Sequence, residues 1–175
     1  MIKNILYLLF VFVIVSSCKT QQPTATITEK GYLVGQISKS DLEKNPFSEW
    51  FFKKYSQYNP DNEVIAKIKP LLKEIEIKGF IGTWCGDSKR EIPRFYKILK
   101  LTNFNVKNFS LIGVDRKLQS IDNQEKGKNI ERVPTFIFYK NGKEIGRFVE
   151  YSVISLEEDI LSILEENGYK NPYAK

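Results

Sequence analysis

Cys85 is the residue in this sequence whose type and position could support nucleophilic chemistry. It lies within residues 83–88, which read TWCGDS. Before it, an apolar stretch at 76–82 predicts a buried strand; after it, apolar side chains recur every three or four positions over 88–101, as in a helix. A cysteine at the start of a helix lies close to unpaired backbone N–H groups and to the positive end of the helix dipole, and both favour the thiolate. Because the thiolate is the nucleophilic form, this position favours a reactive cysteine over a small buried apolar residue.

The remaining residue types narrow the possible chemistry. The chain of 175 residues contains two cysteines and no histidine. The lack of histidine excludes Ser-His-Asp and Cys-His catalysis and any imidazole metal site. If Cys18 is modified as described below, Cys85 is the single thiol, so neither an internal disulfide nor a cysteine metal site can form. We therefore expect no metal and no bound cofactor, and chemistry from one thiol or from carboxylates.

The N-terminus predicts export and a lipid anchor. Lys3 precedes an apolar run over 5–15, and two serines separate this run from Cys18. The run is shorter than the ~20 residues that a membrane-spanning helix needs. It has the order of an export signal, and a cysteine directly after small residues resembles the lipobox of bacterial lipoproteins. We expect residues 1–17 to be a signal peptide and Cys18 to carry the lipid, although an ordinary cleavable signal is the alternative.

These features also predict the domain organisation and location. Residues 18–30 are rich in threonine and glutamine and predict a flexible tether, which leaves 31–175 as one domain, expected to be a monomer. The lipid would hold this domain on a bacterial membrane, facing the periplasm within the cell envelope. The net charge of +6 comes from lysines spread along the chain, without the arginine-rich or basic-aromatic runs of nucleic-acid binders. We therefore expect a membrane contact through the lipid and no nucleic-acid partner.

Further elements follow from periodicity and turn residues. Helices between the early strands predict parallel crossovers, and a late hairpin adds antiparallel strands. The expected fold class is therefore α/β, with a central mixed sheet covered by helices on both faces. The predicted elements are a strand at 32–37, a helix opened by Asn45-Pro46, a helix ended early by Pro70, a strand at 109–115, a polar segment at 116–132, a hairpin around Asn141-Gly142 and a last helix capped by Ser155.

Three motifs resemble the thioredoxin family. Residues 84–88, WCGDS, are similar to the active-site motif W-C-x-x-C of that family, with Ser88 in place of its second cysteine. Pro93, eight residues after Cys85, matches the proline in the family's active-site helix. Residues 133–135, Val-Pro-Thr, with the strand and turn that follow, are similar to the family's cis-proline loop. The motifs share the family's order and spacing over about 79–150, so the resemblance implies a thioredoxin-like fold.

The resemblance also implies roles for individual residues. Cys85 would attack a substrate disulfide, Ser88 holds the resolving position, and Pro134 would form a cis bond with Val133 that faces Cys85. The residues that would contact the substrate are Trp84, Gly86, Asp87, Val133 and Thr135. Partners would be protein thiols and disulfides or a small-molecule thiol. Because serine cannot form a disulfide, release of the substrate would need an external thiol.

The sequence departs from the family pattern at three further positions. Gly79 stands where the family has a buried acid, six residues before the cysteine. Asp87 places a negative charge beside Cys85, which disfavours the thiolate, whereas Lys89 and Arg90 act in the opposite direction. Glu150 stands where the family usually has a glycine near the substrate groove, so it would narrow or charge that surface.

Three functions are compatible with these residues. We favour an exported thiol–disulfide oxidoreductase that forms mixed disulfides through Cys85. The second is a non-catalytic thioredoxin-fold module that binds or scaffolds partners in the cell envelope. The third, a glutaredoxin-like protein that shares an iron–sulfur cluster with glutathione, is disfavoured. Glutaredoxins usually carry Thr-Val-Pro at the proline loop, where this chain has arginine before Val133.

Overall fold

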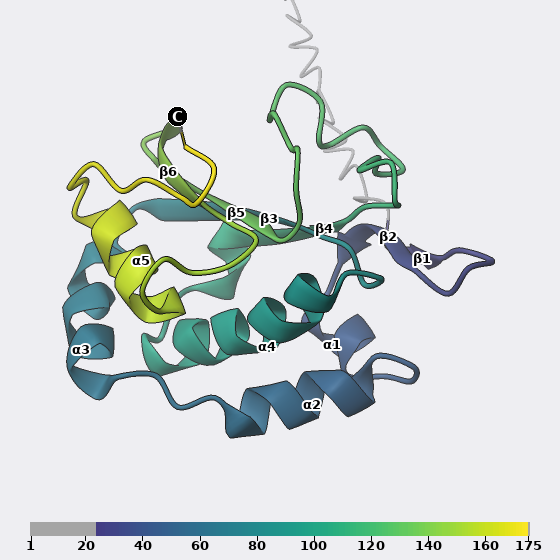
Figure 1. Cartoon of the computed structure of the whole chain (residues 1–175), viewed down its shortest axis with the longest axis horizontal. Coiled ribbons are helices and arrows are strands. Elements are labelled where there is room, and N and C mark those ends of the chain that lie inside the picture. The colour runs from purple at the N-terminus through teal and green to yellow at the C-terminus, as the bar shows by residue number, and fades with distance from the viewer. Residues whose placement is uncertain (1–23, 175) are drawn as a thin grey trace, which may run out of the picture.

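The computed structural model describes residues 24–174. The expected signal peptide and Cys18 lie outside these residues. A six-stranded sheet with the order β1-β2-β4-β3-β5-β6 crosses the molecule (Figure 1). The strands are β1 (Thr26–Ile27), β2 (Leu33–Ile37), β3 (Ile75–Ile81), β4 (Phe109–Gly113), β5 (Thr135–Lys140) and β6 (Lys143–Val149). The helices are α1 (Lys39–Leu42), α2 (Ser48–Gln57), α3 (Asn62–Leu71), α4 (Gly86–Leu101) and α5 (Leu156–Leu164), with a 3-10 turn at Val106–Asn108.

The centre of the sheet agrees with the sequence. β3 and β4 pair in parallel and are connected through α4, as the predicted crossover requires. β5 pairs antiparallel with β3 and with β6, so the late hairpin is confirmed. Asn141 and Gly142 adopt φ values of 51° and 75°, the left-handed conformation that a two-residue type I′ turn needs. The mixed sheet of the predicted α/β class is therefore present.

The direction of β2 differs from the prediction. We expected parallel crossovers between the early strands, but β2 pairs antiparallel with β4, with Gly35 opposite Gly113. Two successive strands are parallel when one helix between them carries the chain back to the end of the sheet at which the first strand began. Here α1, α2 and α3 connect β2 to β3, so the chain can enter β3 from the other end.

The two faces of the sheet are covered differently. One core cluster contains buried residues from all five helices, and its sheet residues include Ile77 and Phe136. The other contains no helical residue and consists of Phe80, Ile112, Val114, Val133 and Ile137. Leu118 and Ile130, from the irregular segment between β4 and β5, pack against this second cluster. We expected helices on both faces, whereas the helices gather on one side of the sheet and this segment lies on the other (Figure 1). Its polar composition lacks the apolar repeat of an amphipathic helix.

The helices that precede β3 agree with the sequence-based prediction, except that α2 begins later than expected. We expected Asn45 to cap a helix with Pro46 as its first residue, but a turn intervenes. The backbone N–H groups of Phe47 and Ser48 donate to the carbonyl of Lys44, at 2.9 and 3.0 Å, and α2 begins only at Ser48. α3 contains Pro70 and ends one residue later, as expected from its missing N–H group.

Part of the expected tether is paired with the sheet. Within 18–30, residues from Thr24 on are described, and Thr26 and Ile27 pair antiparallel with Val34 and Leu33 of β2. The turn that joins them places Lys30 and Tyr32 beside the end of β2. In the described part of the chain, 24–174, no helix combines the length and apolarity needed to cross a membrane.

Candidate active site

Cys85 lies where β3 passes through a short turn into α4. Its backbone N–H donates to the carbonyl of Gly82 at 2.8 Å, and its own carbonyl accepts from the N–H of Lys89 at 3.1 Å, the first bond of the helix. Its φ of −88° and ψ of 131° are those of a residue that precedes a helix, and its thiol is free and partly exposed. The expected position at the positive end of α4 is therefore confirmed.

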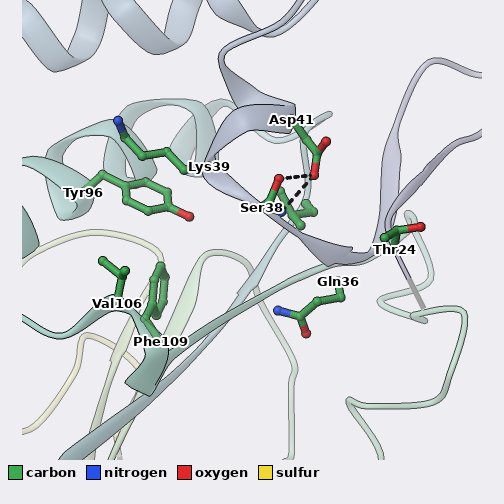
Figure 2. A pocket seen from close by; sticks show the side chains of 9 residues that line it. Thr24, Gln36, Ser38, Lys39, Asp41, Tyr96, Val106 and Phe109 are labelled. Atoms are coloured by element: carbon green, nitrogen blue, oxygen red, sulfur yellow. Dashed lines mark hydrogen bonds between the residues drawn. The ribbon is translucent and has the colours of Figure 1, made fainter. Parts of the chain in front are cut away.

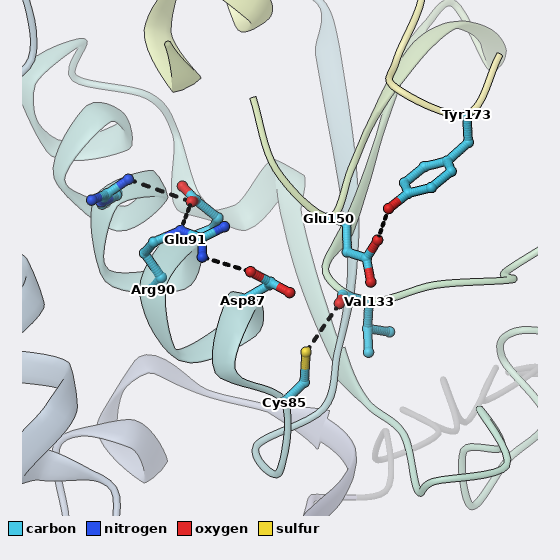
Figure 3. Close-up of polar contacts among 8 residues, drawn as sticks. Cys85, Asp87, Arg90, Glu91, Val133, Glu150 and Tyr173 are labelled. Atoms are coloured by element: carbon cyan, nitrogen blue, oxygen red, sulfur yellow. Dashed lines mark hydrogen bonds and ion pairs between the residues drawn. The ribbon is translucent and has the colours of Figure 1, made fainter. Parts of the chain in front are cut away.

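The proline loop faces this thiol. The Val133–Pro134 peptide bond is cis. The sulfur of Cys85 points towards the carbonyl oxygen of Val133 and donates to it at 3.2 Å (Figure 3). The expectation of a cis bond next to Cys85 is therefore confirmed, and a thiol and a backbone carbonyl that are 48 positions apart in the sequence meet at one point.

Hydrogen bonds hold the proline loop in place. The Thr135 hydroxyl donates to the carbonyl of Arg132 at 2.8 Å, and the N–H of Glu150 donates to the carbonyl of Pro134 at 2.8 Å. Thr135 was expected to contact the substrate, but its side chain is only 2% exposed. It supports the loop from beneath, and Val133 is buried as well, at 4% exposure.

Ser88 is buried behind the turn. Its exposure is 1%, and its hydroxyl oxygen accepts from the N–H of Gly82 at 3.2 Å. Among the described residues, no hydrogen bond joins it to the sulfur of Cys85. The serine at the resolving position therefore stabilises the turn. Both Cys85 and Ser88 form hydrogen bonds with the backbone of Gly82.

Trp84 folds back over this turn. Its indole N–H donates to the carbonyl of Val114 at 2.9 Å. A Cβ atom on Gly82 would lie 2.5 Å from the indole, so only glycine leaves room for the ring. The hydroxyl of Thr83 accepts from the N–H of Leu33 at 3.0 Å and connects the turn to β2. Gly86, by contrast, is exposed beside the thiol.

Comparison with known proteins identifies the family. A family model described as Thioredoxin matches residues 44–158. Thioredoxin from Gallus gallus is 32% identical over 101 residues, which cover 57% of this chain and 89% of that protein. The chain belongs to the thioredoxin family. A thioredoxin-like protein of Acanthamoeba polyphaga mimivirus is 32% identical over 89 residues, 51% of this chain and 62% of that relative, so the chain spans less than two thirds of its length.

A solved thioredoxin structure gives a weaker likeness. The thioredoxin of Plasmodium falciparum is 23% identical, with a TM-score of 0.38, over 58% of this chain and 91% of that one. As in the thioredoxin fold that the sequence predicts, Cys85 follows the end of β3 and meets the cis Pro134 loop, which precedes the neighbouring strand β5. Among residues 24–174, no group of three or more Cys, Asp or Glu side chains is placed to hold a metal ion.

Charged side chains of this thioredoxin-family site form a chain along α4. Asp87 is paired with the guanidinium of Arg90 at 2.5 Å, which offsets the charge that we expected to disfavour the thiolate (Figure 3). Arg90 also contacts the carboxylate of Glu91, and Arg94 lies 3.4 Å from the same oxygen. The sequence reasoning missed Glu91. The available signal was its spacing, four residues before the buried Phe95, which places it on the inward face of the helix.

Glu91 is an unusual buried carboxylate. It is 1% exposed, and its Oε2 atom has no hydrogen-bond partner among the described residues. Burial raises the pKa of Glu91 above its usual value of 4.5, because the loss of hydration outweighs the hydrogen bond and charge of Arg90 and the charge of Arg94. The folded state therefore disfavours the ionised form of this side chain.

The mutant Glu91→Gln should change the pH dependence of stability. Since the folded-state pKa is raised, the unfavourable contribution is absent below the unfolded-state pKa and grows as pH rises above about 4.5. The amide cannot ionise, so the free energy of unfolding should fall less between pH 4 and 7 than in the wild type. Urea unfolding at several pH values in that range measures it. Replacement of the exposed Glu76 by Gln is the control, and an equal slope for wild type and Glu91→Gln would contradict the assignment.

A second cluster, of which the sequence had singled out only Glu150, borders the proline loop. The hydroxyl of Tyr173 donates to the carboxylate of Glu150 (Figure 3). The Arg132 guanidinium lies 4.0 Å from the centre of the Tyr173 ring and 3.6 Å from a Glu150 oxygen. Glu150 adopts a φ of 65°, the left-handed region in which the family's glycine would be unstrained. These three side chains, brought together from distant positions, form one rim of the site.

Proposed function

We propose that this protein takes part in thiol–disulfide exchange through Cys85 alone. The observation that carries the proposal is the 3.2 Å contact between the Cys85 sulfur, at the start of α4, and the Val133 carbonyl beside the cis Pro134. Membership of the thioredoxin family supports a redox role on protein thiols or disulfides at a coarse level.

The chemistry follows from having one thiol. The Cys85 thiolate attacks one sulfur of a substrate disulfide, a new S–S bond forms, and the other substrate sulfur leaves as a thiolate. Ser88 cannot attack the resulting mixed disulfide, since an alcohol does not undergo this exchange. An external thiolate must therefore displace the substrate and release Cys85.

Trapping the mixed disulfide tests the proposal. In a Cys18→Ser background, where Cys85 is the single thiol, incubation with a disulfide-containing protein should give a stable covalent adduct that a reductant removes. We expect one equivalent of substrate thiolate to be released per protein, and the adduct to be lost in Cys85→Ser. Non-reducing electrophoresis and intact mass measure both. A wild-type thiol that forms no adduct over the neutral pH range would instead favour the non-catalytic binding module.

We also propose that the protein is exported and attached to a membrane of the cell envelope through a lipid on Cys18. The proposal rests on the apolar run over 5–15 and the cysteine that follows two serines. Cys18→Ser should move the protein from the membrane pellet to the soluble exported fraction, as measured by cell fractionation. Cys85→Ser, which keeps Cys18, should stay in the pellet. A Cys18→Ser protein that remains membrane-bound would contradict a lipoprotein anchor.

A further inference from the structure

A hollow of about 350 Å³ opens beside Trp84, the residue before Cys85. Its charged lining residues are Lys30, Lys89 and Arg116, and no acidic side chain lines it. None of the three is in an ion pair within residues 24–174. The hollow therefore carries positive charge that no ion pair offsets, beside the residue that precedes Cys85, and this charge favours anionic ligands.

Arg116 is held in a defined position at this hollow. Its Nε donates to the hydroxyl of Tyr32 at 2.9 Å. Its guanidinium carbon lies 5.5 Å from the centre of the Tyr32 ring and 5.1 Å from that of Trp84, within the range of cation–π attraction. The two terminal nitrogens form no hydrogen bond with another described residue. The planar guanidinium of Arg116 is therefore fixed, and its two terminal nitrogens can donate to a carboxylate.

Two nearby acids form no ion pair with these cations. Asp115, in the neighbouring hollow, accepts through one oxygen from the backbone N–H groups of Lys117 and Gln119, at 2.8 and 2.9 Å, and so stabilises its own turn. Glu29 lines that neighbouring hollow too, and it forms no ion pair with Arg116. The positive side chains beside Trp84 therefore remain available.

A larger hollow elsewhere shows the contrast. It has a volume of about 450 Å³ and lies at the other end of the sheet, where Ile37 pairs with Leu111. Its charged groups are engaged locally: Asp41 accepts from Ser38 (Figure 2), and Lys39 is paired with Glu43. That hollow has no free charge, whereas the one beside Trp84 has three cations outside any ion pair of the described residues and is lined by Thr83 and Trp84, the two residues before Cys85.

We propose that the hollow beside Trp84 binds the carboxylate of a low-molecular-mass anionic thiol, and that this thiol resolves the mixed disulfide on Cys85. The inference rests on the proposed exchange through Cys85. A volume near 350 Å³ is at the lower end of the ~300–1,000 Å³ of small-molecule sites, so it suits a small thiol and not a folded partner. Arg116 would bind the carboxylate, with Lys30 and Lys89 adding attraction.

The resolving steps balance as ordinary thiol–disulfide exchange. The bound thiolate attacks the sulfur of Cys85, the Cys85–substrate S–S bond breaks, and the substrate leaves as a thiolate with the electron pair. A second molecule of the same thiol then attacks the small-molecule sulfur of the new mixed disulfide. This second attack releases the Cys85 thiolate and a symmetrical small disulfide. Two external thiols are oxidised for each substrate disulfide that is reduced.

Thiols that differ in charge test the inference. The full chain with Cys18→Ser is converted to a thionitrobenzoate mixed disulfide on Cys85, and release of thionitrobenzoate is followed with mercaptoacetate, mercaptoethanol and cysteamine. Each rate is divided by that of the same thiol with the mixed disulfide of a short uncharged cysteine peptide. We expect the wild type to prefer mercaptoacetate, and Arg116→Gln to lower that preference by about three- to tenfold, as loss of a charge-assisted hydrogen bond predicts.

Matched variants make the result decisive. Arg116→Lys keeps the charge and should retain part of the preference, and Lys143→Gln removes an exposed charge at the start of β6 and should retain all of it. An unchanged preference in Arg116→Gln overturns the inference, as does a preference that only Arg132→Gln, on the other rim, removes. A Cys85 that forms no thionitrobenzoate adduct would instead overturn the proposed exchange itself.

Discussion

Ser88→Cys is expected to convert the protein into an efficient dithiol reductase. In a Cys18→Ser background, this variant should reduce insulin disulfides at least about tenfold faster than the wild type with the same external reductant. The reason is proximity: an internal thiol attacks a neighbouring disulfide with an effective concentration far above that of a dissolved thiol. The structure places both residues at one point, since Gly82 accepts from the Cys85 N–H and donates to the Ser88 side chain.

The control for this variant is Ser88→Ala. Both substitutions remove the oxygen that accepts from the Gly82 N–H, so both should lower stability by a similar amount, about 1 kcal/mol. Only the cysteine supplies a resolving thiol, so the alanine variant should reduce insulin no faster than the wild type. Insulin turbidity gives the rate, and intact mass shows whether an internal disulfide forms. A Ser88→Cys protein that accumulates the mixed disulfide without turnover would contradict the shared geometry.

The parts of the fold that depend on local chemistry were predictable. The turn at Asn141-Gly142 and the strand–turn–helix around Cys85 follow from residue types within a few positions, whereas the cis bond before Pro134 was expected from the resemblance to the thioredoxin family. The direction of β2 was not predictable in this way, because its pairing with β4 joins residues more than 70 positions apart. Its apolar pattern is the same for either direction.

The same distinction applies to the site. The motif predicted that the Val133–Pro134 bond faces Cys85, as the structure shows, but it assigned a substrate contact to Thr135 and the resolving position to Ser88, which are 2% and 1% exposed. Burial depends on what packs above a residue, which a short motif does not contain. The positions of Arg116 and Tyr173 depend on irregular segments, where periodicity gives no information. The rims of the site therefore required the structure.

Gly79→Asp should strongly destabilise the protein. The substitution restores the acid that the family has six residues before its cysteine, yet even its Cβ atom would need the neighbouring side chains to shift. A Cβ atom at Gly79 would lie 3.0 Å from a Leu111 methyl carbon, 3.1 Å from the Phe136 ring and 3.2 Å from the Phe109 ring. A carboxylate would extend into this apolar cluster, where no cationic partner lies, and we expect a loss of about 3–5 kcal/mol in the free energy of unfolding at neutral pH.

Gly79→Ala separates the steric contribution to this loss of stability from the contribution of the buried charge. It adds only the Cβ atom, so we expect a loss of about 1–3 kcal/mol from overpacking, and this loss should not depend on pH. The loss in Gly79→Asp should become smaller in acid, where the carboxyl group is neutral. Urea unfolding at acid and neutral pH measures both. A Gly79→Asp protein as stable as Gly79→Ala at neutral pH would mean that the core can accept the family's acid. If Gly79→Asp behaves as expected, Cys85 exchanges its proton with solvent or with the incoming thiol. Aromatic side chains occupy the position in which the family has an internal base.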